Sequence, residues 1–487
     1  MVNGKKIYSG LFWKLLERFG VQGSQFVLQI ILARLLAPEH YGVLSMMVIF
    51  TTLANVFIQR GFNTALIQNK DVTEEDYSSV FWVTMLVAAL LYALLFVTAP
   101  FIGDFYNMPE LVAPFRVLCL VLFPGALNSI QLAKISRILD FKKVFFSNLS
   151  AILISGITGI VFALMGAGLW SLVVQFLLNV VVACIVMWFT VKWRPKFVCN
   201  ILRIKVLFSY GWKLLVSSLI DTLYQDLRSL VIGKKYSSAV MGFYNRGKQF
   251  PQFIINAANS TVQSVMLPAM SSNQEDSKNV KALMRQSISM SSYIMFPIMG
   301  GLAGVAAPLI SILLTDKWLP CVPYMQIYCF TLAFYPIHSC NLQAINAVGR
   351  SDIYLKLEVI KKLYGVLALV IAVLFFDSPI VIAFTGVITS LISCAVNAFP
   401  CKKLFGYSYF EQIKDMAPSF ISALIMAISI YFIQKLNMNN YITIIIQFFA
   451  GVAIYLFLSI ILKNPSFESL IKVVKNIIFK RKKFAEK

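Results

Sequence analysis

The chain has 487 residues, 59% of them hydrophobic, and a mean hydropathy of +0.77. This composition lies beyond that of soluble globular proteins and predicts a membrane protein. The net charge of +22 also suits a nucleic-acid-binding protein, but the basic residues are spread over short loops, which disfavours that function.

Apolar segments of about 20 residues, the length that crosses a bilayer core, follow one another along nearly the whole chain. They are too long for barrel strands, and only helices or closed barrels satisfy the backbone in lipid. The connections are too short to hold a folded catalytic domain. We therefore expect an all-α polytopic membrane protein with about fourteen transmembrane helices. Numbered as spans 1 to 14, they are expected at 11–35, 41–67, 79–102, 110–133, 144–167, 169–191, 206–232, 238–267, 284–314, 320–346, 355–376, 379–400, 416–434 and 441–462.

The basic residues between these spans predict the orientation. With a cytoplasmic N-terminus, 28 Lys and Arg fall on the inside and 5 on the outside. Cytoplasmic loops of membrane proteins are enriched in Lys and Arg. This bias indicates an even number of spans, with both termini cytoplasmic. Beyond the last span, Phe467, Leu470, Ile471, Val474 and Ile478 fit a basic amphipathic helix on the inner leaflet or, beyond Lys480, a solvated tail.

Cysteine and histidine patterns indicate neither a metal site nor a cofactor. The eight cysteines are scattered, mostly within spans, and form no C-x-x-C pair, while His40 and His338 are the two histidines of the chain. We interpret the cysteines as structural.

The sequence repeats itself at the scale of six spans. Trp13-Lys-Leu-Leu recurs as Trp212-Lys-Leu-Leu, and Pro124 and Pro336 occupy matching positions in spans 4 and 10. Because six is even, the halves form a parallel repeat, an arrangement that places a substrate path at the interface of the halves. We expect an N-terminal six-helix lobe at 1–200, a C-terminal six-helix lobe at 201–412, two additional transmembrane helices at 413–463 and a basic cytoplasmic tail at 464–487.

Two spans at matching positions in the repeat carry a polar stripe through an otherwise apolar helix. At about 100° per residue, each set lies within a narrow arc of its helix. The stripe of span 1 contains Lys14, Arg18, Gln22, Gln25 and Gln29, and that of span 7 contains Lys213, Ser217, Asp221, Tyr224 and Arg228. Spans 2 and 8 have similar rows, which include Ser45, Thr52, Gln59, Asn63, Asn245, Gln249, Gln252, Asn256, Asn259 and Gln263, with Arg60, Arg246 and Lys248 beside them.

Charges inside a bilayer face a bundle interior or a water-filled cavity. We therefore expect the four polar faces to line one cavity, whose excess of cations indicates an anionic, hydrogen-bonding substrate such as a pyrophosphate that carries sugars. The candidate binding residues are Lys14, Arg18, Gln22, Gln25, Arg60, Lys213, Arg228, Arg246, Gln249 and Asn256. Structural alternatives stay open. Lys14 and Lys213 fit snorkelling anchors, and the amide rows fit interhelical contacts.

Asp221 is the acidic residue placed deepest in span 7. A carboxyl group there can lose its charge by protonation, which makes it a candidate for the coupling proton. A structural ion pair with Arg228 is the alternative.

Three segments carry a resemblance to a known family: GLFWKLLERFGVQG at 10–23, LARLLAPEHYG at 32–42 and GFNTALIQ at 61–68. They resemble the Wzx-type polysaccharide flippases, in particular the colanic and teichuronic acid branch, of the multidrug/oligosaccharidyl-lipid/polysaccharide exporter superfamily. The resemblance extends over essentially the whole chain, although no family motif fixes the binding residues.

The resemblance implies that the protein flips undecaprenyl-pyrophosphate-linked oligosaccharide across the bacterial inner membrane for cell-surface polysaccharide synthesis, whether lipopolysaccharide or exopolysaccharide. It also implies a proton or sodium ion as coupling ion, and membrane lipids and other polysaccharide-assembly proteins as partners. The alternatives are a multidrug cation antiporter, a lipid II flippase, and an enzyme, namely a membrane glycosyltransferase or polymerase. The enzyme is disfavoured because it needs a larger external loop with acidic residues.

Overall fold

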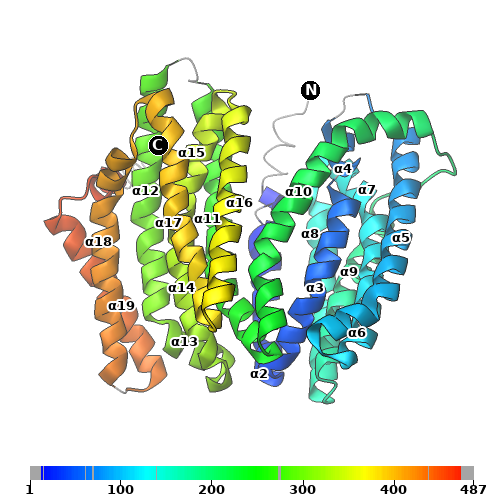
Figure 1. Ribbon diagram of the computed structural model, residues 1–487, viewed down its shortest axis with the longest axis horizontal. Coiled ribbons are helices and arrows are strands. Elements are labelled where there is room, and N and C mark those ends of the chain that lie inside the picture. The colour runs from blue at the N-terminus through cyan, green and yellow to red at the C-terminus, as the bar shows by residue number, and fades with distance from the viewer. Residues whose placement is uncertain are drawn as a thin grey trace, which may run out of the picture. The chain divides into compact units, whose positions relative to one another are not determined.

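The computed structural model describes residues 12–14, 16–60, 62–68, 71–138, 140–272, 276–436 and 438–472. Contacts divide the chain into two compact units, Met1–Gly242 and Phe243–Lys487. Every element of the described residues is helical (Figure 1). This agrees with the expected all-α class, while most of the predicted tail lies outside the described residues.

The N-terminal unit is a bundle of long helices joined by short turns. Thr73 and Asp76 form a capping box that starts α5, and Gly166 and Gly168 adopt positive φ in the turn before α9. After a π-helix at Glu17–Val21, the helices are α2 (Gln22–Leu35), α3 (Pro38–Gln59), α4 (Phe62–Gln68), α5 (Glu74–Tyr106), α6 (Val112–Leu118), α7 (Leu122–Ile138), α8 (Phe141–Leu164), α9 (Leu169–Thr190) and α10 (Ile201–Lys235).

The C-terminal unit is a second bundle. Its first helix, α11 (Ser238–Ser271), begins in the N-terminal unit and continues into this one. The others are α12 (Ser277–Gly304), α13 (Ala306–Leu314), α14 (Val322–Ala333), α15 (Tyr335–Ala347), α16 (Ser351–Phe375), α17 (Pro379–Phe405), α18 (Tyr409–Ile433) and α19 (Asn440–Ile461).

The chain is a multi-span membrane protein. Among the described residues, eight helices are long and apolar enough to cross a bilayer, and up to ten are if two bent pairs each count as one span. Each of the fourteen expected ranges overlaps helical residues, but the count of fourteen is not confirmed. Span 1 illustrates the difference, because α2, with 14 residues, follows directly on the π-helix Glu17–Val21 rather than forming one long α-helix.

Span 9 is broken where α12 meets α13, at an angle of 66°. A break exposes carbonyl groups that need partners inside a membrane. The Gln326 side chain of α14 donates to Ala303 O at 3.1 Å, and that of Gln447 of α19 donates to Gly304 O at 3.4 Å. The Gly304 position has no room for a side chain, because a Cβ would lie 2.5 Å from Cγ1 of Ile430. The break is therefore held by neighbouring helices.

Helix α10 packs within the N-terminal unit, against α3, α4 and α5. The start of α11 is fixed there too, because a Cβ at Gly42 would lie 1.7 Å from Ser238 O, and one at Gly242 would lie 2.2 Å from Pro38 O. The packing boundary thus falls at Gly242, whereas the repeat suggested a boundary at 200. The repeat and the packing group the seventh span differently.

Candidate functional site

The amide stripe of α2 borders the packed face of the helix. Leu28 and Leu32, which are buried in an apolar cluster with Ile152 of α8, lie next to Gln25 around the helix at about 100° per residue. Gln22 is exposed and Gln25 is half-buried. These two candidates are thus partly accessible, as an aqueous lining requires.

The basic end of span 1 makes local contacts. Lys14 is exposed, with Nζ 3.9 Å from Glu17 Oε2 and 4.4 Å from the centre of the Phe141 ring. Glu17 Oε1 also accepts from Asn148 Nδ2 at 3.4 Å. These contacts fit the snorkelling alternative for Lys14. The side chain of Arg18, the neighbouring candidate, lies outside the part of the chain that the structure describes.

Arg60 caps the C-terminal end of α3. Its backbone N–H donates to Val56 O and its side chain is exposed. Asn63, one helical turn further, is 9% exposed, and its Oδ1 is a buried acceptor without a partner. The polar row of span 2 therefore changes from exposed to buried within one turn.

The stripe of α10 is graded in exposure. Lys213 and Ser217 are exposed, whereas Asp221 and Arg228 are half-buried. The opposite face is packed, since a Cβ at Gly233 would lie 3.2 Å from Met46 Cγ and from Tyr106 Cε1, closer than ordinary van der Waals contact. Asp221 and Arg228 each interact with other groups of the protein. The helix thus presents its polar stripe on the side away from its contact with α3.

The C-terminal unit holds the remaining candidates, all on α11. Arg246 is 5% exposed, its Nη1 donates to Gln249 Oε1 at 2.6 Å, and its guanidinium lies 5.2 Å from the centre of the Trp318 ring. Gln252 Nε2 donates to Asn256 Oδ1 at 2.9 Å, and Asn256 is exposed. Arg246 is therefore much less accessible than an ordinary cavity-lining cation.

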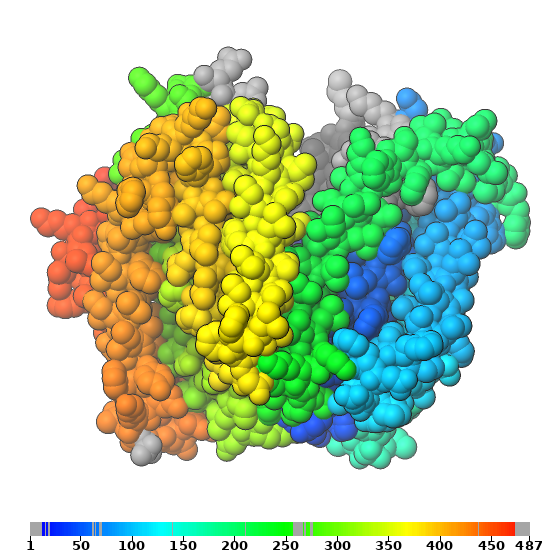
Figure 2. All heavy atoms as spheres, in the orientation of Figure 1, coloured from blue at the N-terminus to red at the C-terminus, as the bar shows by residue number. Residues whose placement is uncertain are grey.

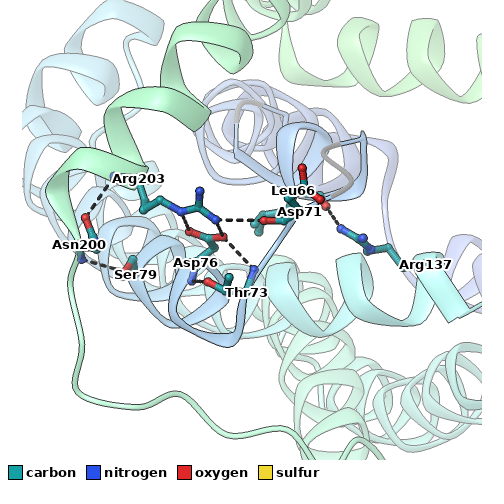
Figure 3. A network of polar contacts seen from close by, with 8 residues as sticks. All are labelled: Leu66, Asp71, Thr73, Asp76, Ser79, Arg137, Asn200 and Arg203. Atoms are coloured by element: carbon teal, nitrogen blue, oxygen red, sulfur yellow. Dashed lines mark hydrogen bonds and ion pairs between the residues drawn. The ribbon is translucent and has the colours of Figure 1, made fainter.

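Helical periodicity does not predict the polar network that joins α5 to α10 (Figure 3). Nε and Nη2 of Arg203 donate to the two oxygens of Asp76 at 2.8 and 2.7 Å, and Asp76 is 1% exposed. The hydroxyl of Ser79 accepts from the backbone N–H of Asn200 at 2.9 Å, and the Asn200 side chain caps α10. Asp76 and Arg203 are 127 residues apart, and a contact at that separation leaves no trace in the helical periodicity of the sequence.

The chain is similar in sequence and in fold to known proteins. Residues 31–323 match the family model described as "Polysaccharide biosynthesis protein". The chain belongs to this family. The resemblance to Wzx-type polysaccharide flippases is thereby confirmed.

Three curated relatives extend over most of the chain. The teichuronic acid biosynthesis protein TuaB of Bacillus subtilis (strain 168) is 26% identical over 467 residues, which is 93% of this chain and 95% of that protein. The succinoglycan biosynthesis transport protein ExoT of Rhizobium meliloti (strain 1021) is 22% identical, with 93% and 92% coverage. The lipopolysaccharide biosynthesis protein WzxC of Escherichia coli (strain K12) is 22% identical, with 75% of each chain covered.

Two solved structures share the fold. The lipid II flippase MurJ, in an inward closed conformation, has a TM-score of 0.74 at 17% identity and covers 95% of this chain and 100% of its own. An inward-facing multidrug resistance MATE transporter has a TM-score of 0.60 at 15% identity, with 80% and 98% coverage. At these identities the likeness shows the fold alone.

Proposed function

We propose that this protein flips a lipid-linked oligosaccharide, joined to its polyprenyl carrier by a pyrophosphate, across the bacterial inner membrane for cell-surface polysaccharide synthesis. The family match carries the proposal, because curated relatives over nearly the full chain are named for the biosynthesis or transport of such polysaccharides. Transport takes place by alternating access and involves no covalent chemistry.

The polar stripe of α10 supports an anionic, sugar-rich substrate. Arg228 and Lys213 supply cations, and the partly accessible glutamines of α2 supply hydrogen-bonding groups of both kinds. A pyrophosphate takes charge-assisted hydrogen bonds from the cations, and sugar hydroxyls pair with amides. A multidrug cation antiporter is the weaker proposal, because a cationic surface repels its substrate.

Both termini are cytoplasmic in this proposal, and a proton or sodium ion drives the cycle. Asp221 is the candidate on α10 for proton coupling. The glycan is one of the bacterial surface polysaccharides, and assembly proteins of the same polysaccharide are the expected partners. The orientation rests on the distribution of Lys and Arg over the loops.

Deletion of the gene followed by lipid analysis tests the proposal. We expect polyprenyl-pyrophosphate-linked repeat units to accumulate, inaccessible to a membrane-impermeant oxidant added outside, and surface polysaccharide to disappear. Re-expression of the gene restores both. Normal surface polysaccharide in the deletion strain, or accumulation of lipid II instead, contradicts the proposal.

A further inference from the structure

A polar cluster lies inside the C-terminal unit, among helices α15, α16 and α17. These three helices pack against one another. Figure 2 shows α16 in yellow along the face of this unit that is turned to the viewer, beside α17 in orange. His338 of α15 is the centre of the cluster, and it contacts Ser390, Cys394 and Asn397 of α17.

The hydrogen bonds assign the proton on the His338 ring. Ser390 Oγ donates to Thr331 O at 3.0 Å, so this hydroxyl is left to accept from Nε2 of His338, 3.2 Å away. On the other side of the ring, Asn397 Nδ2 lies 3.4 Å from Nδ1 and donates to it. His338 is therefore neutral here, with its proton on Nε2.

The Asn397 side chain can supply an acceptor for a second proton on the His338 ring. Asn397 is fully buried, and its Oδ1 has no hydrogen-bond partner. A buried polar atom without a partner costs free energy. If Nδ1 gains a proton, rotation of the Asn397 amide by half a turn brings Oδ1 to face it. Both N–H groups of the imidazolium then have acceptors, and the orphaned oxygen gains a donor.

An ion pair on α16 controls the charge beside the ring. Lys361 Nζ is bonded to Glu358 Oε1, and the two side chains are 15% and 24% exposed. Lys361 acts electrostatically on His338, and Glu358 acts on Tyr335 one turn away on α15. Both charges lie within the apolar span 11, where charges are costly and commonly functional.

Several other titratable groups on the helices around α15 bond elsewhere. Lys281 and Arg285 of α12 bond to carboxylates of α18, Tyr328 of α14 bonds to Tyr244, and Tyr364 of α16 bonds to Ser393 of α17. Cys394 contacts the His338 ring itself. These helices also carry Lys278, Tyr293, Tyr324, Cys329, Tyr335, Cys340, Asp352, Tyr354, Lys356, Lys362, Cys401, Lys402 and Lys403.

We propose that His338, Asn397 and the Lys361–Glu358 pair form a proton-binding site in the C-terminal unit, and that binding of a proton there gates export. The gating rests on the proposed function, whereas proton binding does not. A proton on His338 adds a positive charge near Lys361, which repels the ammonium group and attracts Glu358. Protonation therefore changes the contact between α15 and α16, a change that transport can use.

The first experiment measures proton binding without any substrate. The chain has two histidines, so the His40→Gln variant leaves His338 as the single one. We expect imidazole ¹⁵N NMR of this variant in lipid nanodiscs to show a single histidine that changes from neutral to charged as the pH is lowered. At high pH the spectrum should show the proton on Nε2.

Second variants in the single-histidine background test the partners. Lys361→Gln should move the titration midpoint to higher pH, and Glu358→Gln to lower pH, each by about one pH unit, because a neighbouring charge is removed or left uncompensated. Asn397→Leu should move it to lower pH because it removes the acceptor. A ring that stays neutral at every pH at which the protein remains folded, or a midpoint that none of the three variants moves, overturns the site.

Measurements of polysaccharide export at several external pH values then test whether proton binding gates transport. Surface polysaccharide of the His338→Gln strain should lose its dependence on external pH, while the His40→Gln strain retains the wild-type profile. An unchanged profile in both strains overturns gating. If gene deletion leaves surface polysaccharide intact, the proposed function fails while the NMR result stands, so the two failures are distinguishable.

Discussion

Each unit ties two of its helices together with an ion pair. In the N-terminal unit, Asp76 at the start of α5 binds Arg203 at the start of α10. In the C-terminal unit, Arg285 of α12 binds Asp415 near the start of α18, at 2.6 Å. In the predicted repeat α5 corresponds to α12, whereas α18 is one of the two additional helices outside the repeat. We call these contacts the N-terminal clamp and the C-terminal clamp.

The two clamps differ in geometry more than in burial. The partners are 127 residues apart in one clamp and 130 in the other. Both carboxylates are buried, with Asp76 1% and Asp415 8% exposed, while Arg203 is 40% and Arg285 57% exposed. Arg203 binds both oxygens of Asp76, whereas Arg285 binds one oxygen of Asp415. We expect the N-terminal clamp to contribute more stability.

The largest effect is expected on export, from substitution of Arg228, a cation of α10 that takes no part in the N-terminal clamp. Arg228→Ala should reduce export about tenfold or more without loss of protein, because a charge-assisted hydrogen bond contributes about 1.5–3 kcal/mol. Arg228→Lys should be less damaging but not neutral, since an ammonium lacks the planar fork. Export is measured as surface polysaccharide in a deletion strain that carries each variant. Wild-type export with Arg228→Ala, and likewise with Arg60→Ala and Arg18→Ala, would rule out the substrate-binding role of the stripe.

Loss of the N-terminal clamp should have the next largest effect, on stability. Arg203→Ala leaves the buried Asp76 carboxylate without its cation, and we expect a measurable loss in the free energy of unfolding, smaller than that of a fully buried pair because Arg203 is 40% exposed. Denaturant unfolding in detergent micelles measures it. The double variant Asp76→Asn, Arg203→Ala should recover part of the loss. A change below about 0.5 kcal/mol contradicts the assignment of this clamp as the stronger one.

The clamps also show how far sequence reasoning reaches. Ranges of apolar helices follow from local run length, and the expected spans overlap the observed helices for that reason. The break in span 9 depends on Gln326 and Gln447, which come from other helices, so no local pattern predicts it. In the candidate site, helical periodicity predicts the stripe of α10. It carries no information on the contact of Arg246 with Trp318, because that contact arises from tertiary packing.

Substitutions of Arg246 in the C-terminal unit distinguish a structural role of this cation from a role in substrate binding. Its guanidinium faces Trp318, so we expect a coupling free energy of about 1 kcal/mol between the two side chains in a double-mutant cycle of Arg246→Ala and Trp318→Leu, with unfolding as the readout. Substrate binding by Arg246 predicts in addition that Arg246→Lys lowers export at normal stability. Additive effects of the two substitutions on stability would remove the structural role.

The smallest effect is expected for the C-terminal clamp. Arg285 is 57% exposed, and surface ion pairs contribute at most about 1 kcal/mol. Its partner Asp415 also accepts from Tyr407 Oη at 2.8 Å, so it keeps a hydrogen bond when Arg285 is removed. Arg285→Ala should therefore lower the free energy of unfolding by less than about 1 kcal/mol, with a smaller change at high salt because solvent ions screen exposed charges. The matched comparison is Arg203→Ala under the same conditions, whose effect should be larger because Arg203 binds both oxygens of Asp76 and is less exposed than Arg285. Equal losses from the two variants at both salt concentrations would show that neither the two-oxygen geometry nor the burial of the arginine decides the strength of a clamp.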